Sequence, residues 1–170
     1  DHAFVANFLD GKDAAFVSGD IGRLYWGNVK RLQRNALYLK PRTVLMLDTV
    51  TPADKDVDVT VLYQPGYLKD IQADPKASKI TKEKATLEIR HIYPENVAVT
   101  AEKTPIYINT LLREVPLHAE GMLTVTAKTQ GRPLVVANLM STDATGLKTA
   151  AGAGHVAGSQ AGKDFAFSTN

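Results

Sequence analysis

The residues best suited to chemistry in this chain are cations gathered near its start. Between Ile21 and Thr43 there are six basic residues and no acidic one. These are Arg23, Lys30, Arg31, Arg34, Lys40 and Arg42. A guanidinium group presents a fork of N–H donors that matches a carboxylate or a sulfate, so Lys30, Arg31 and Arg34 are candidates for binding an acidic substrate. The alternatives are a solvated strand face, or arginines that dock against another domain.

Aromatic residues lie close to these cations in the sequence. Trp26 and Tyr38 lie on either side of Lys30, Arg31 and Arg34, and Tyr25 precedes Trp26. Aromatic rings stack on sugar rings, so Trp26 and Tyr38 join the candidate substrate-binding residues. In a β-sandwich, however, a Trp or Tyr beside a strand more often packs in the core.

The histidines do not form a metal-binding or catalytic motif. They are His2, His91, His118 and His155, and no pair has a metal-ligand spacing. His91 alternates with apolar residues, which predicts a hydrogen-bonded core histidine. Ser141, Asp143 and His155 have the residue types of a hydrolase triad, but Ser141 lacks the Gly-x-Ser-x-Gly turn. We therefore expect no catalytic residue, no metal and no cofactor in this chain.

Length and composition indicate one globular domain over residues 1–170. Hydrophobic residues make up 44% and charged residues 22%, which is ordinary for a globular protein. A net charge of +2 gives no argument for nucleic acid as a partner. No apolar run approaches the roughly 20 residues of a membrane span. Cysteine is absent, and the first seven residues show no signal peptide, although export stays open.

Most of the chain has the pattern of short strands. Val57–Tyr63 and Ala85–Tyr93 alternate apolar and polar residues, as a strand with one buried face does. Thr43–Val50 and Pro133–Met140 are nearly continuous apolar runs, which is typical of central strands covered on both faces. With Met122–Ala127 and turns rich in Gly and Pro, these strands predict an all-β fold, an antiparallel, jelly-roll-like β-sandwich of two sheets.

Other segments are less regular. Val29–Leu39 fits both helical spacing and an imperfect alternation, and composition leaves it undecided. Asp70–Lys84 is polar, which predicts an exposed loop. Leu147–Gly162 is rich in Ala and Gly, which predicts a flexible hairpin or loop. Phe165 and Phe167 are expected to be the inward pair of a last strand.

Four consecutive segments carry a resemblance to a known family. They are Phe16-Val-Ser-Gly-Asp20, Val29-Lys-Arg-Leu-Gln-Arg34, Leu37-Tyr-Leu-Lys-Pro41 and Val44-Leu-Met-Leu-Asp48. This succession resembles the C-terminal β-sheet domain of the heparinase II/III-like polysaccharide lyases. The resemblance extends over essentially the whole chain and favours a strand for Val29–Leu39.

The resemblance implies a part of a larger enzyme. Family members cleave uronic-acid polysaccharides by β-elimination, and a catalytic α/α toroid precedes the β-domain. The resemblance therefore implies a secreted or periplasmic bacterial protein, an upstream toroid as partner, and no lyase activity in this chain alone. Two alternatives stay open. A free-standing module that binds acidic glycans predicts salt-sensitive binding, whereas a structural or oligomerisation domain predicts a contiguous apolar surface patch.

Overall fold

The computed structural model describes residues 3–25, 27–54, 56–103, 106–109, 114–117, 121–152, 155–160 and 162–168. Over these residues the protein is all-β, as predicted, and every strand pair is antiparallel. The first eight strands are β1 (Phe4–Asp10), β2 (Ala14–Asp20), β3 (Val29–Leu39), β4 (Thr43–Pro52), β5 (Asp58–Gly66), β6 (Ile71–Gln72), β7 (Ala77–Lys82) and β8 (Ala85–Tyr93). The others are β9 (Ala98–Lys103), β10 (Ile106–Asn109), β11 (Glu114–Leu117), β12 (Gly121–Lys128), β13 (Leu134–Ser141), β14 (Lys148–Gly152), β15 (His155–Gln160) and β16 (Lys163–Ser168).

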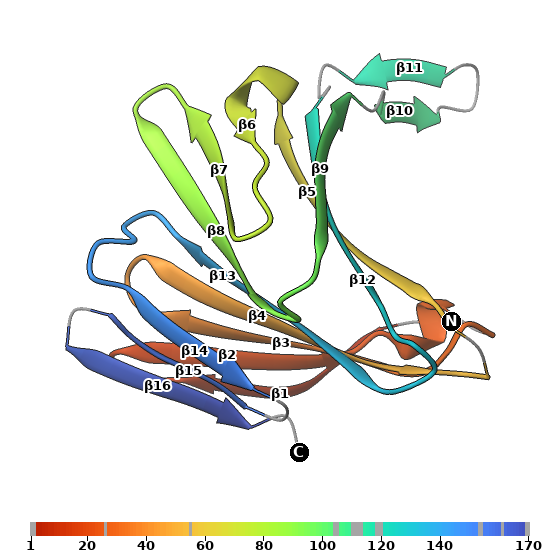
Figure 1. The fold of residues 1–170 in the computed structure, drawn as a ribbon, viewed down its shortest axis with the longest axis horizontal. Helices are drawn as coiled ribbons and strands as arrows, with labels where there is room; N and C mark the ends of the chain where they lie inside the picture. Colours follow the sequence, from red (N-terminus) through yellow and green to blue (C-terminus); the bar gives the residue numbers. More distant parts are fainter. Residues whose placement is uncertain are drawn as a thin grey trace.

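One large sheet organises the molecule. Its eight strands follow the order β1-β2-β3-β4-β13-β8-β7-β6, and two three-stranded sheets, β5-β12-β9 and β14-β15-β16, accompany it. In Figure 1 the β14–β16 sheet lies alongside β1–β3 at the lower left, whereas β5, β9 and β12 rise on the right. The two-stranded sheet β10-β11 and two short 3-10 turns, η1 (Gly22–Tyr25) and η2 (Leu68–Asp70), complete the described structure. No helix in these residues is long and apolar enough to cross a bilayer.

The described residues form two separate cores, and β13 contributes to both. Leu45 and Leu47 pair with Leu139 and Ala137, and on that face they pack against the β14–β16 sheet. The first core consists of Leu45, Leu47, Ala137, Leu139, Leu147, Val156 and Phe165. The intervening residues point to the opposite face, because side chains alternate along a strand. Both faces of these strands are covered, which explains why their sequences are nearly continuous apolar runs.

The second core lies between the large sheet and β5-β12-β9. It consists of Val61, Val97, Val125, Ala127, Leu134 and Val136. Val136 stands opposite Asp48 across the β13–β4 pair. An acidic residue therefore lies at the margin of this core.

The less regular segments resolve into strands. Val29–Leu39 is β3, as the resemblance favours. The exposed loop predicted for Asp70–Lys84 is wrong in part, because this segment contains β6 and β7. Ser78 of β7 is fully buried, and it alternates with the exposed Lys79, so the small buried residue gave no apolar pattern in the sequence.

The predicted hairpin in the Ala- and Gly-rich segment is confirmed as β14–β15. Its small residues make room for an aromatic ring, because a Cβ atom at Gly158 would collide with Phe165. Phe165 is buried, and Phe167 packs against the same core with its ring centroid 6.1 Å from that of Phe16. The inward pair predicted for the last strand is therefore confirmed.

Candidate functional site

A partly buried ion pair marks the junction between the large sheet and β5. Arg34 of β3 stands directly opposite Asp48 of β4, so their side chains share one face of the sheet. Arg34 donates from Nε to Asp48 Oδ1 and from Nη2 to Asp48 Oδ2, both at 2.7 Å. The Asp48 side chain is 5% exposed and that of Arg34 is 43% exposed. The Asp48 carboxylate is therefore shielded from solvent, whereas part of the Arg34 guanidinium stays accessible to it.

Tyr63 of β5 lies near this pair. Its hydroxyl is buried and has no hydrogen-bond partner among the described residues. The pKa of Tyr63 is raised, first by burial and then by the charge of Asp48. The pKa of Arg34 is also raised, chiefly by its hydrogen bond to Asp48, although burial opposes this. The phenol is thus neutral and the guanidinium charged at physiological pH.

A cavity of about 400 Å³ opens beside the pair, between β3, β4 and β5. Its polar lining residues are Tyr25, Asn28, Arg34, Asp48, Asp56, Asp58 and Thr60. Asp48 neutralises the Arg34 guanidinium, so the interior has no unpaired positive charge that would favour a polyanion. The Asn28 amide can exchange hydrogen bonds with hydroxyl groups, and the half-exposed Tyr25 offers an aromatic surface. The Thr60 hydroxyl is bonded instead to Thr126 on the outer face of β5. The lining therefore suits a neutral, hydroxyl-bearing group.

The structure separates the basic candidates predicted from the sequence. Arg31 stands opposite Thr51 and Arg34 opposite Asp48, which places these two arginines on opposite faces of β3. Arg31 is exposed, and its Nη2 donates to Gln33 Oε1 at 2.6 Å. These arginines therefore cannot bind one ligand from the same face.

The remaining candidates lie apart from one another as well. The Lys30 side chain is 64% exposed, and its Nζ lies 3.5 Å from Asp54 Oδ1. Tyr38 shares the face of Arg34 but lies about 13 Å further along the strand. The Tyr38 hydroxyl donates to the carbonyl of Pro41 at 2.7 Å. Trp26 lies outside the described residues.

The contact of Arg34 with Asp48, and the position of Tyr63 near them, were not predicted from the sequence. One signal was available, because Asp48 is the only charged residue within the apolar stretch Thr43–Val50. A carboxylate in a central strand needs a partner when it is buried. What the sequence did not show is that Arg34 would be that partner.

His91 is a core histidine, as predicted. It is 8% exposed, and its Nε2 lies 3.0 Å from Ser78 Oγ while its Nδ1 lies 2.8 Å from Asn138 Oδ1. Burial is the main cause that lowers the pKa of His91. The neutral ring thus joins β7, β8 and β13, and Ser78 is fully buried, so this serine does not face a substrate.

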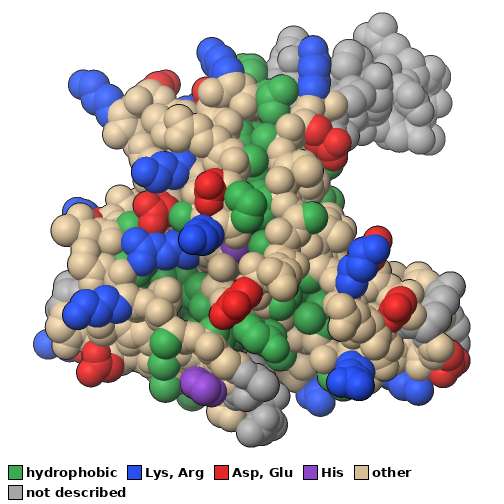
Figure 2. Space-filling model, in the orientation of Figure 1, with side chains coloured by type: hydrophobic (Ala, Val, Ile, Leu, Met, Phe, Trp, Pro, Cys, Tyr) green, Lys and Arg blue, Asp and Glu red, His purple; other side chains and the backbone are tan. Residues whose placement is uncertain are grey.

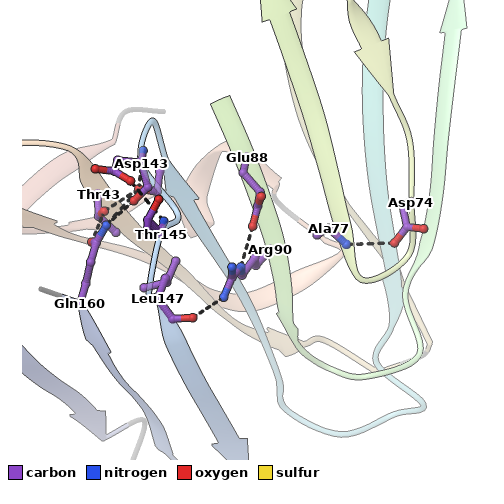
Figure 3. A network of polar contacts seen from close by, with 10 residues as sticks. Thr43, Asp74, Ala77, Glu88, Arg90, Asp143, Thr145, Leu147 and Gln160 are labelled. Carbon is purple, nitrogen blue, oxygen red and sulfur yellow. Dashed lines mark hydrogen bonds and ion pairs between the residues drawn. The ribbon is translucent and has the colours of Figure 1, made fainter. Parts of the chain in front are cut away.

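Ser141 and Asp143 take part in a network of hydrogen bonds, and Figure 3 shows Asp143 with its neighbours Thr43 and Gln160. The Ser141 hydroxyl donates to the carbonyl of Asp143 at 2.8 Å. Thr43 and the Gln160 side chain are hydrogen-bonded to each other, and Gln160 also donates to the carbonyl of Asp143. These bonds tie the ends of β4, β13 and β15 together. They support rejecting a hydrolase triad, because Ser141 is buried and already bonded.

Charges elsewhere are mixed. On the face shown in Figure 2, Lys and Arg side chains are interspersed with Asp and Glu. Within the described ranges, no group of three or more His, Asp or Glu side chains could hold a metal ion. His2 and His118 lie outside those ranges.

Solved structures share this arrangement of sheets. The heparan sulfate lyase HepC from Pedobacter heparinus matches 98% of this chain with a TM-score of 0.68 and 10% identity. A mutant of the same lyase matches 98% with a TM-score of 0.68 and 11% identity. A heparinase III structure matches 98% with a TM-score of 0.65 and 10% identity. The chain has the fold of a heparinase III domain.

The structural match confirms the fold that the sequence resemblance implies. The chain spans 28% of the two HepC chains and 27% of the heparinase III chain. No family model and no curated protein matches the sequence. The relation to heparinase III therefore rests on three-dimensional structure.

Proposed function

We propose that this chain is the β-sandwich part of a larger, secreted or periplasmic bacterial polysaccharide lyase that acts on uronic-acid polysaccharides by β-elimination. The observation that carries the proposal is the likeness to heparan sulfate lyases over 98% of the chain. Most of each HepC chain lies outside the shared fold, since this chain covers 28% of its length. The partner in this proposal is the α/α toroid that the sequence resemblance implies.

Within that enzyme the chain acts as a scaffold and as one wall of the substrate cleft. β-Elimination needs a base and an acid that both reach the substrate. His91 and Tyr63 have suitable side chains, but His91 is 8% exposed and the Tyr63 hydroxyl is buried. Following the family resemblance, in which the proton-transfer groups lie upstream of this domain, we assign proton transfer to residues outside this chain.

Lys30 and Arg31 are the cations best placed to contact an acidic sugar. Both are exposed, and their partners Asp54 and Gln33 hold them through surface contacts. Exposed ion pairs contribute little, so a carboxylate or sulfate can replace these partners. Arg34 is committed to Asp48, and the cavity beside it suits sugar hydroxyl groups. Tyr38 and Trp26 stay candidates for stacking.

Calorimetric titration of the chain with acidic oligosaccharides tests the glycan contact. Heparin-type and alginate-type oligosaccharides are compared with a neutral one at low and moderate salt, and we expect binding of the acidic ligands that weakens with salt. Arg31→Ala should weaken it roughly fivefold, equivalent to about 1 kcal/mol. Arg132→Ala is the matched control, because Arg132 is an exposed arginine in the turn before β13.

The outcomes separate the alternatives. An equal loss in both arginine variants would show unspecific attraction and contradict a contact at Arg31. Absorbance of unsaturated product from the chain alone would contradict the non-catalytic role. A free-standing glycan-binding module predicts the same titration, but its reading frame would contain no toroid before Asp1.

A further inference from the structure

Exposed hydrophobic side chains gather on the outer strand β1. Phe4 is 51% exposed, Val5 67%, Phe8 66% and Leu9 70%. They occupy both faces of the sheet, because consecutive residues of a strand point to opposite faces. Phe8 and Leu9 are consecutive, and they pair with Val17 and Phe16 of β2. Apolar side chains on both faces are typical of a strand inside a sheet. β1, however, is the last strand in the sheet order.

The other sheet edges differ from β1. Natural edge strands avoid pairing with other chains by being short or by carrying charged residues and proline. At the opposite edge of the same sheet, β6 has only two residues. The edge strand β16 begins with Lys163 and Asp164, and the edge strand β5 contains Asp58 and Pro65. β1 has seven residues, of which only the last, Asp10, is charged, and no proline. Its free edge is therefore suited to accept another strand.

A second feature lies beside the start of β1. An apolar cavity of about 300 Å³ is lined by Phe4, Val5, Val17, Ile21 and Ala36, with Arg34 at its wall. A hydrophobic side chain from a neighbouring segment would fill this space and remove exposed apolar surface from water. The edge and the cavity thus point to the same occupant.

We propose that the outer edge of β1 pairs with an additional β-strand, and that an apolar side chain of that segment fills the cavity. The strand comes from the rest of the longer polypeptide in which the proposed function places this chain, so the inference rests on that function. A second copy is a poorer occupant, because two joined eight-stranded sheets would exceed the roughly ten strands that twisted open sheets usually reach. One added strand stays within that limit.

Hydrogen exchange on the longer polypeptide tests the added strand. Along an uncovered edge strand, only the amides that face β2 are protected, whereas the outward-facing amides exchange with solvent. We expect nearly all amides of Phe4–Asp10 to exchange as slowly as those of β2. Rapid exchange of about half of them, as at a free edge, would overturn the proposal. Protection that disappears when a dimer dissociates on dilution would overturn it in favour of a second copy.

Lysine substitutions locate the contact. A double variant with Val5→Lys and Phe8→Lys should restore fast exchange to the outward amides of β1 and leave β2 to β4 protected. Leu62→Lys is the matched control, because Leu62 is 52% exposed on the edge strand β5, and it should leave β1 protected. Unchanged protection of β1 in the double variant would contradict the proposal.

Lyase activity of the same polypeptide separates the two proposals. An active lyase whose β1 keeps free outward amides would refute the added strand and leave the proposed function intact. A fully protected β1 in a polypeptide without lyase activity would support the strand and contradict the function.

Discussion

The two faces of the large sheet differ in what their side chains contact. On the face toward β14–β16, buried apolar side chains such as Leu45, Leu47 and Leu139 form a continuous core, and hydrogen bonds close its end (Figure 3). On the face toward β5, the core ends at an ion pair, a tyrosine hydroxyl with no partner among the described residues and a cavity of about 400 Å³. Apolar residues in place of a buried ion pair are often no less stable. We infer that the first face provides stability and the second face is available for function.

The largest expected effect on stability comes from a substitution in the core on the first face, toward β14–β16. Leu139 is fully buried, so Leu139→Ala should lower the free energy of unfolding by about 2–5 kcal/mol through lost burial and a new cavity. Urea unfolding measures the change. The exposed Leu62 is the control, and Leu62→Ala should change stability by about 0.5 kcal/mol at most. Similar losses of stability in both variants would mean that the core between the large sheet and the β14–β16 sheet is not tightly packed.

The second largest effect tests the ion pair. Arg34→Met leaves the buried Asp48 carboxylate unpaired and should cost about 3 kcal/mol, the low end of the range for such pairs, because Arg34 is half exposed. The double variant Arg34→Met with Asp48→Leu should recover most of that loss, since neither charge remains. Urea unfolding of both variants gives the comparison. A double variant as unstable as the single one would show that the pair itself stabilises the fold.

The strands could be predicted well because their local pattern reports burial directly. Thr43–Val50 and Pro133–Met140 are apolar on both faces, and they became the central strands β4 and β13. β7 was missed because its buried residues are small or isolated. Ser78 and Ile80 alternate with lysine and threonine, and such a strand is stabilised by its pairing with β8 rather than by its own composition.

The candidate site could be predicted only in part, because it depends on register. Arg34 and Asp48 are 14 residues apart in sequence, and only the β3–β4 pairing brings them face to face. The same register turns Arg31 to the other face, so cations that are close in sequence are separated in space. A one-residue shift in register would reverse that assignment.

A smaller effect is expected when the pH is lowered, and it concerns the buried His91 of β8. Burial lowers the pKa of His91 in the folded protein below 6.5, so the unfolded chain binds a proton more readily. The contribution to stability is fully present above pH 6.5 and is lost as the pH falls through the lower folded-state pKa. The slope should be at most about 1.4 kcal/mol per pH unit.

Urea unfolding between pH 7.5 and 5 measures this loss, and His91→Gln serves as the control that should abolish it. Asp74 and Asp143 do not interfere, because their pKa values lie below 3.8 in the folded protein. An unchanged pH dependence in His91→Gln would assign the loss to other groups.

The smallest expected effect has the opposite sign and concerns the unbonded phenol. Tyr63→Phe removes a buried hydroxyl that has no partner among the described residues, so it should raise the free energy of unfolding by up to about 1 kcal/mol. Tyr38→Phe is the matched control, because the Tyr38 hydroxyl donates to Pro41 at an exposed position, and its loss should cost about 0.5 kcal/mol. Urea unfolding distinguishes the two signs. Destabilisation by Tyr63→Phe would mean that water in the neighbouring cavity bonds the hydroxyl, which would make this face a hydrated polar site and not a defect in packing.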